Sequence, residues 1–221
     1  MLNATYKFST MNKAKIDQIF ARLAAQNPHP VTELNYSNGF TLLVSIVLSA
    51  QATDASVNKA TPALFALADN PKDMLALGEA DVKHFIKTIG LYNSKAVNLM
   101  GLCRMLIDEF GGEVPHTLEE LQRLPGVGRK TANVWLNNAL RLPTIGVDTH
   151  VFRVSNRLGL CKTTTADATE FALEKAVPEK WKLNAHHWLI LHGRYICVAR
   201  KPICPECIVR ELCGFKDKTL G

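Results

Sequence analysis

Residues 124–130 read LPGVGRK, and this stretch decides the fold because it joins two helical patterns through a glycine-rich turn. Gly126 and Gly128 permit positive φ and leave the backbone amides uncovered by side chains. The second helix is expected to begin here, so its N-terminal N–H groups and positive dipole end face the turn. The pattern predicts a helix-hairpin-helix at about residues 117–141 that binds one DNA phosphate without reading sequence. A plain helix-to-helix turn is the alternative, since Gly-x-Gly alone is a weak signal.

Hydrophobic spacing predicts helices along almost the whole chain. Residues 12–26 carry apolar side chains at spacings of three and four, and residues 39–50 are apolar on every side, as in a helix buried in the middle of a domain. Further helices are expected at about 54–68, 71–78, 81–88, 94–110, 117–124, 128–140, 148–158, 165–177 and 181–198. Convincing period-two alternation is lacking, so the predicted fold class is all-α.

Composition places the chain among ordinary globular proteins with a polyanionic partner. Its 221 residues, 47% hydrophobic and 21% charged, suffice for one large or two small domains, and the net charge is +6. The N-terminus lacks the apolar core of a signal peptide, and the most apolar run, residues 40–50, is too short to span a bilayer. We therefore expect a cytoplasmic protein, of prokaryotic origin, with a domain boundary near residues 142–147.

Lys130 follows directly on the glycine-rich turn. By residue type alone, such a lysine is most simply a second phosphate contact. The sharper interpretation is an amine that attacks carbon and forms a Schiff base. That reaction needs a neutral amine, which the neighbouring Arg129 and the helix N-terminus favour.

Asp148 is the single acidic residue between positions 121 and 160, a stretch that holds six lysines and arginines. An aspartate ahead of a helix is a good N-cap, and a cap also fixes the direction of the carboxylate. A carboxylate amid basic residues repels a DNA backbone, so its presence indicates a use in chemistry. That use is to assist deprotonation of the amine and to stabilise positive charge on a sugar.

Four cysteines near the C-terminus follow the pattern C-x6-C-x2-C-x5-C, and they are Cys197, Cys204, Cys207 and Cys213. Such clustering in a cytosolic chain predicts a metal centre. The spacing is not that of two C-x2-C knuckles, which disfavours a zinc ribbon and favours one [4Fe–4S] cluster in the loop 197–213. We expect a structural cluster, because the proposed chemistry has no redox step. Cys103, Cys161, His186 and His187 are expected to be ordinary buried side chains.

Several segments together resemble the endonuclease III family. They are residues 48–54, 90–96, 124–134, 147–154 and 186–194, together with the four-cysteine pattern, and they cover nearly the whole chain. The resemblance implies a two-domain helix-hairpin-helix DNA glycosylase fold with a C-terminal [4Fe–4S] loop. A six-helix domain would span residues 32–142, residues 1–31 and 143–221 would form the cluster domain, and the active site would lie in the cleft between them.

The resemblance also implies a base excision repair enzyme that removes oxidised pyrimidines from duplex DNA. It would then cleave the abasic strand by β-elimination, without Mg²⁺. Lys130 matches the Schiff-base lysine and Asp148 the catalytic aspartate. The DNA-contacting positions are Gln51, which fills the gap left by the extruded base, Leu91, which wedges into the opposite strand, and Gly126, Val127, Gly128, Arg129 and Lys201. Its partner is double-stranded DNA with damaged pyrimidines or abasic sites, and the family favours a monomer that contacts no membrane.

Two departures and two rival functions bear on this interpretation. Trp135 stands where a smaller apolar residue is expected, and Gly146 where alanine is expected, so local packing needs explanation. A monofunctional glycosylase of the adenine–mismatch type shares the hairpin, aspartate and cluster, but Lys130 argues against it. A DNA-binding module without catalysis would leave Asp148 only a capping role.

Overall fold

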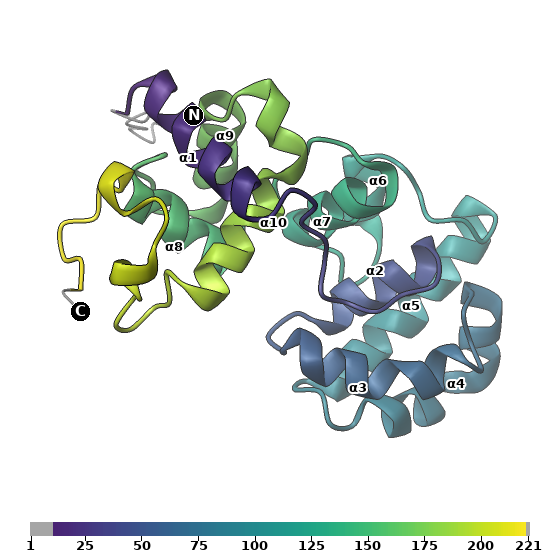
Figure 1. Ribbon diagram of the computed structural model, residues 1–221. Coiled ribbons are helices and arrows are strands. Elements are labelled where there is room, and N and C mark those ends of the chain that lie inside the picture. Colours follow the sequence, from purple (N-terminus) through teal and green to yellow (C-terminus); the bar gives the residue numbers. More distant parts are fainter. Residues whose placement is uncertain (1–10, 220–221) are drawn as a thin grey trace. The chain divides into compact units, whose positions relative to one another are not determined.

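The computed structural model describes residues 11–219, which fold into helices (Figure 1). Their bounds are α1 Lys13–Gln26, α2 Gly39–Leu48, α3 Asp54–Phe65, α4 Pro71–Ile86, α5 Tyr92–Phe110, α6 Leu118–Arg123, α7 Arg129–Leu140, α8 Thr149–Leu158, α9 Ala166–Ala176 and α10 Glu179–Tyr195, with 3₁₀ helices η1 Cys204–Glu206 and η2 Arg210–Leu212. The prediction of an all-α fold is confirmed. The expectation about the N-terminus falls mostly on residues 1–10, which lie outside the described residues.

The described chain divides into two compact units, each with its own core. One unit comprises residues 32–141 and holds α2 to α7. The other unit combines the described residues up to Val31 with those from Leu142 onward, and it holds α1 and α8 to α10. Two segments distant in sequence therefore share one core.

In the six-helix unit, α2 supplies the centre of the core. Its residues from Phe40 to Leu48 are all buried, as the apolar stretch predicted. The helix begins with a capping box, in which the side chains of Asn38 and Thr41 each bond the other's backbone. The expected pair of short helices between residues 71 and 88 forms one element, α4, whose halves meet at Gly78 with φ 83° and ψ 161°. Glycine adopts that conformation without a Cβ clash, so it marks the kink.

Trp135 occupies the same core, although a smaller apolar residue is expected at this position. Its side chain is 2% exposed, and its Nε1 donates a hydrogen bond to the carbonyl oxygen of Gly39 at 2.8 Å. The ring stacks on His116 with centroids 6.0 Å apart. The indole thus joins α7 to the start of α2 and satisfies its polar atom inside the core.

The second unit has a core built around α1, α8 and α10. Ile19 and Phe20 of α1 are fully buried with Val151 and Val154 of α8 and Leu189 of α10. Val209, between the two 3₁₀ helices, is also fully buried in this core. The cysteine-rich loop is therefore anchored to the helices by its own apolar side chain.

Candidate active-site and cluster residues

The predicted hairpin is present, with α6 and α7 flanking the turn at residues 124–128. Gly126 has a φ of 80°, a left-handed conformation that favours glycine. Gly128 is extended, with φ −89°, so it does not use the positive φ that glycine permits. Its role is different, because it caps α7 and a Cβ there would meet no atom within 4 Å. Glycine therefore leaves open space directly in front of the helix N-terminus.

The rest of the turn is held by the core of the six-helix unit. Leu124 and Val127 are 2% and 5% exposed. A Cβ at Gly101 of α5 would lie 3.2 Å from Pro125 Cγ, and one at Gly126 would lie 3.1 Å from Asn98 Cβ. The turn consequently packs tightly along α5 on one side and presents exposed Gly128 on the other.

Arg129 and Lys130 are the first two residues of α7. Arg129 is exposed and Lys130 is half-buried. Every residue from Thr131 to Asn137 is buried, so the helix that carries both cations is fixed in the core. Their position at the positive end of the helix dipole suits contact with anions and disfavours added positive charge.

Asp148 lies in the second unit and is the N-cap of α8. Its Oδ1 accepts hydrogen bonds from the backbone N–H groups of His150 at 2.9 Å and Val151 at 2.8 Å. Both bonds use the same oxygen, so capping does not occupy Oδ2. Capping and chemistry are thus compatible, because the cap orients the carboxylate and leaves its second oxygen for another partner.

Arg153 and Gly193 hold the α8 turn in place, and neither is among the site residues predicted from the sequence. The guanidinium of Arg153 donates to Cys197 O at 3.0 Å and to Gly193 O at 2.8 Å, and its Nη2 lies 3.2 Å from His150 Nδ1. A Cβ at Gly193 would lie 2.9 Å from His150 Cβ. A glycine inside the apolar helical stretch 181–198 was the available signal, since a glycine within a helix can have a packing reason.

Gln51 and Leu91 are both exposed residues in the left-handed region, with φ of 53° and 60°. The two turns lie side by side, because a Cβ at Gly90 would be 3.6 Å from Gln51 O. Leu91 is 58% exposed and begins α5 without a side-chain cap. Such strain in a bulky residue is uncommon and clusters at functional sites. Lys201 shares the feature, with φ 52°, and is exposed in the cysteine-rich loop.

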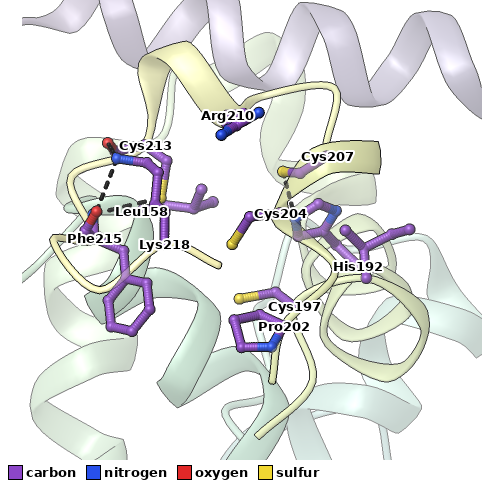
Figure 2. A pocket seen from close by; sticks show the side chains of 11 residues that line it. Leu158, His192, Cys197, Pro202, Cys204, Cys207, Arg210, Cys213, Phe215 and Lys218 are labelled. Carbon is purple, nitrogen blue, oxygen red and sulfur yellow. Dashed lines mark hydrogen bonds between the residues drawn. The ribbon is translucent and has the colours of Figure 1, made fainter. Parts of the chain in front are cut away.

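The four cysteines line one cavity (Figure 2). A hydrogen bond of 2.9 Å from Ile203 N to Ile196 O closes the segment after Cys197. The remaining cysteines lie in η1 or directly after η1 and η2. Figure 2 shows the sulfur atoms of Cys197, Cys204 and Cys207 turned toward a shared space. Residues 196–213 therefore bring together side chains that the sequence spacing had grouped.

The donor set fits an iron–sulfur cluster, because four cysteine side chains line one cavity. In a zinc site with four thiolates, each sulfur lies about 2.3 Å from the same ion. A polynuclear cluster separates its four ligand sulfurs more widely, and thiolates are its usual ligands.

Three sulfur atoms have nitrogen donors beside them. Arg157 Nη1 lies 3.6 Å from Cys197 Sγ, His192 Nε2 lies 3.5 Å from Cys207 Sγ, and the backbone N of Phe215 lies 3.4 Å from Cys213 Sγ. Hydrogen bonds to ligand sulfur are a regular part of iron–sulfur sites. Each of these three sulfur atoms therefore has a nitrogen donor placed to bond it when it ligates a metal.

The side chains expected to be structural are buried. Cys103 and Cys161 are 0% and 2% exposed, and burial raises the pKa of Cys103 to about 12. His186 and His187 are each 3% exposed, and His186 Nδ1 lies 2.8 Å from the carbonyl oxygen of Gly146. Gly146, one of the two departures, thereby supplies a backbone partner for a buried histidine.

Comparisons with known proteins agree with the helical architecture and the hairpin. A model of HhH-GPD superfamily base excision DNA repair proteins matches residues 44–179. Endonuclease III of Escherichia coli (strain K12) is 56% identical over 208 residues, which make up 94% of this chain and 99% of that protein. Endonuclease III of Haemophilus influenzae is 54% identical, also over 94% of this chain and 99% of that protein. A solved structure of a trapped endonuclease III–DNA covalent intermediate matches with a TM-score of 0.87 and 45% identity, over 93% of this chain and 97% of that one.

Fold and comparisons together define a helix-hairpin-helix glycosylase of base excision repair. Within that class, the chain belongs to the endonuclease III family. It is accordingly a bifunctional enzyme, a DNA glycosylase and abasic-site lyase. Across residues 11–219, every helix is too short or too polar to traverse a lipid bilayer.

Proposed function

We propose that this enzyme removes oxidised pyrimidines from duplex DNA and then cleaves the abasic strand through a Schiff base on Lys130. The observation that carries the proposal is the position of Lys130 in the first turn of a buried helix, directly after the hairpin. The relative solved as a trapped covalent DNA intermediate supports a covalent step. Substrate class follows from the endonuclease III family, to which the chain is similar over 94% of its length.

DNA binding begins at the hairpin in this proposal. One phosphate oxygen occupies the open space before α7 and accepts hydrogen bonds from the amides at the start of that helix, beginning with Gly128. The backbone N–H of Val127 donates to Leu124 O at 3.0 Å, so Val127 contributes by holding the turn in shape. The exposed side chains of Gln51 and Leu91 enter the duplex together, and their adjacent strained turns support this role. Extrusion of a nucleotide costs roughly a few kcal/mol, which damage to the base lowers. Lys201 adds a cationic contact from the cysteine-rich loop.

Lys130 then carries the chemistry. The lone pair of Nζ forms a bond to C1′ of the sugar as the bond from C1′ to the damaged base breaks. The attached Nζ loses one of its two protons, and the bond from C1′ to O4′ then breaks as O4′ takes up a proton. The product is an iminium between Nζ and C1′ that keeps one N–H. The iminium acidifies the 2′ hydrogens, so removal of one of them expels the 3′ phosphate by β-elimination. Elimination of this kind needs no metal-bound water, and Mg²⁺ is therefore not required.

Asp148 stabilises positive charge on the sugar as the base departs. Two amides fix its Oδ1 at 2.8 and 2.9 Å, so the carboxylate does not need to reorganise during the reaction. Oδ2 is left to accept a proton from the attacking amine or to face the cationic carbon. Preorganisation of this kind explains why a single acidic residue is retained in a basic segment.

The second unit is proposed to hold one [4Fe–4S] cluster on Cys197, Cys204, Cys207 and Cys213. When bound, the cluster supplies four metal–thiolate links that fix the loop and the exposed Lys201 within it. We also propose a monomer that acts on DNA in the bacterial cytoplasm, with residues 32–142 as the hairpin domain and residues 1–31 and 143–221 as the cluster domain.

Borohydride trapping tests the central step. Wild-type protein incubated with abasic duplex DNA and borohydride is expected to give a covalent adduct, and Lys130→Ala is expected to give none. Lys72→Ala removes an exposed lysine from the same unit and serves as the matched control. The mechanism is wrong if wild type gives no adduct or if Lys130→Ala traps as well as Lys72→Ala. Strand cleavage must also persist in EDTA.

A further inference from the structure

His192 is a buried side chain that the proposed chemistry does not use. It lies in the last turn of α10 and is 5% exposed. Its Nε2 lies 3.5 Å from Cys207 Sγ, as the dashed line in Figure 2 shows. Within residues 11–219, the ring makes no other recorded hydrogen bond. A polar ring at this depth is therefore directed at one sulfur atom of the cysteine-lined cavity.

The backbone fixes the ring against that sulfur. The carbonyl oxygen of His192 accepts hydrogen bonds from Ile196 N at 3.0 Å and from Cys197 N at 2.7 Å. One residue is thus bonded to the cysteine-rich loop at its start, through the backbone of Cys197, and near its middle, through the sulfur of Cys207. The contact is a fixed part of the loop and not a chance approach of a mobile side chain.

Chemistry determines the direction of this hydrogen bond. A cysteine that ligates iron has lost its proton, so its sulfur can only accept. His192 must then carry a hydrogen on Nε2 and donate it. Resting on the proposed [4Fe–4S] cluster, we infer that His192 donates an N–H···S hydrogen bond to Cys207 and raises the reduction potential of the cluster. Reduction adds negative charge to the cluster and its sulfurs, so a donor stabilises the reduced form more than the oxidised form.

His192 differs from the donors to Cys197 and Cys213, because its side chain can be replaced without removing other hydrogen bonds of the loop. Arg157 also bonds Val198 O at 2.7 Å and Ala199 O at 2.9 Å, so its removal would disturb the loop itself. The donor to Cys213 is the backbone N of Phe215, which no ordinary substitution removes. His192 is consequently the position at which a sulfur hydrogen bond can be changed with the least disturbance of the chain. The lyase reaction has no redox step, so we place His192 in the tuning of the cluster and outside catalysis.

The test compares two variants. His192→Leu fills the position with an apolar side chain and removes the donor, whereas His192→Gln keeps an N–H donor at similar reach. Midpoint potentials of the DNA-bound proteins are measured by electrochemistry, after iron and sulfide content show equal cluster loading. His192→Leu is expected to have a more negative potential than wild type, and His192→Gln to return toward wild type. Borohydride trapping per loaded chain is expected to remain unchanged in both variants.

A wild-type potential in loaded His192→Leu, or an equal shift in His192→Gln, would overturn the inference. If His192→Leu does not retain its cluster, wild-type protein labelled with ¹⁵N-histidine supplies the second measurement. Electron–nuclear double resonance of its reduced cluster is expected to show coupling to a histidine nitrogen, and absence of that coupling also overturns the inference. Failure of the proposed cluster itself is separate, because wild type would then contain no iron.

Discussion

Gly193 of α10 and His150 of α8 approach so closely that a Cβ at position 193 would lie 2.9 Å from His150 Cβ. The same atom would lie 3.0 Å from Val154 Cγ2. His150 donates its backbone N–H to Asp148 Oδ1 at 2.9 Å. Glycine at 193 therefore sets how near α10 comes to the turn that orients the Asp148 carboxylate.

Gly193→Ala is expected to move α8 away from α10 and disturb that turn. Overpacking of this kind lowers the free energy of unfolding by about 1–3 kcal/mol, and the rate of base excision should fall with it. Urea unfolding followed by circular dichroism and single-turnover excision measure the two effects. Gly39→Ala is the matched control, because its Cβ would lie at an ordinary 3.5 Å from the Trp135 ring. Equal stability and rate in the two variants would contradict the assignment.

Asp148 allows capping to be separated from catalysis. Asparagine caps helices about as well as aspartate, so Asp148→Asn should change the free energy of unfolding by less than roughly 0.5 kcal/mol. Loss of the charge should nevertheless lower the excision rate by about 10²-fold or more. Asp148→Ala loses both functions and should also be destabilised by about 1 kcal/mol. If Asp148→Asn is stable and keeps the wild-type excision rate, Asp148 has a capping role and no catalytic role.

Much of this arrangement follows from local sequence rules. The apolar stretch at residues 39–50 predicted the central helix, and the glycine-rich turn predicted the hairpin, because both depend on residues adjacent in the chain. The cysteine spacing grouped four thiols for the same reason, since residues 196–213 form a short closed loop. The Asp148 cap was likewise readable from an acid preceding a helical pattern.

Other features depend on packing between distant segments and were not predictable. Arg153 contacts both Gly193 O and Cys197 O, which lie 40 and 44 residues away in sequence. Trp135 fits the core only because the carbonyl oxygen of Gly39, 96 residues earlier, accepts its N–H. The glycines of the turn permit positive φ, but the backbone at Gly128 is extended and a Cβ there would meet no atom within 4 Å. Spacing along a sequence carries none of this information.

Gly126 and Gly128 should respond differently to the same substitution. At Gly126, alanine would adopt a strained φ of 80° and place a Cβ 3.1 Å from Asn98 Cβ, so the free energy of unfolding should fall by roughly 1–3 kcal/mol. At Gly128, the backbone is extended and the space is open, so Gly128→Ala should lower the free energy of unfolding by less than about 1 kcal/mol, through the poorer N-cap that alanine makes. Its methyl group would instead occupy the proposed phosphate position and weaken DNA affinity by about tenfold, equal to about 1.4 kcal/mol.

Fluorescence anisotropy with lesion-containing duplex at one fixed salt concentration measures the affinity, since salt alone changes it strongly. Thermal unfolding in the absence of DNA measures the stability. The phosphate assignment would be lost if Gly128→Ala bound DNA as tightly as wild type, and the packing argument would be lost if Gly126→Ala were fully stable.

Leu91 has a strained backbone and an exposed side chain, so we expect it to lower the stability of the protein while contributing to activity. A bulky residue in the left-handed region costs roughly 1–2 kcal/mol, whereas asparagine tolerates it. Leu91→Asn should therefore raise the free energy of unfolding by up to about 1 kcal/mol while slowing excision from duplex DNA. Val97→Asn removes a comparably exposed apolar side chain from the same helix without relieving strain, and it should gain no stability and keep its activity. Excision from a single-stranded lesion oligonucleotide should be equal for both, because Leu91 is proposed to act on the opposite strand. If Leu91→Asn and Val97→Asn behave alike on duplex DNA, the strained turn has no part in opening it.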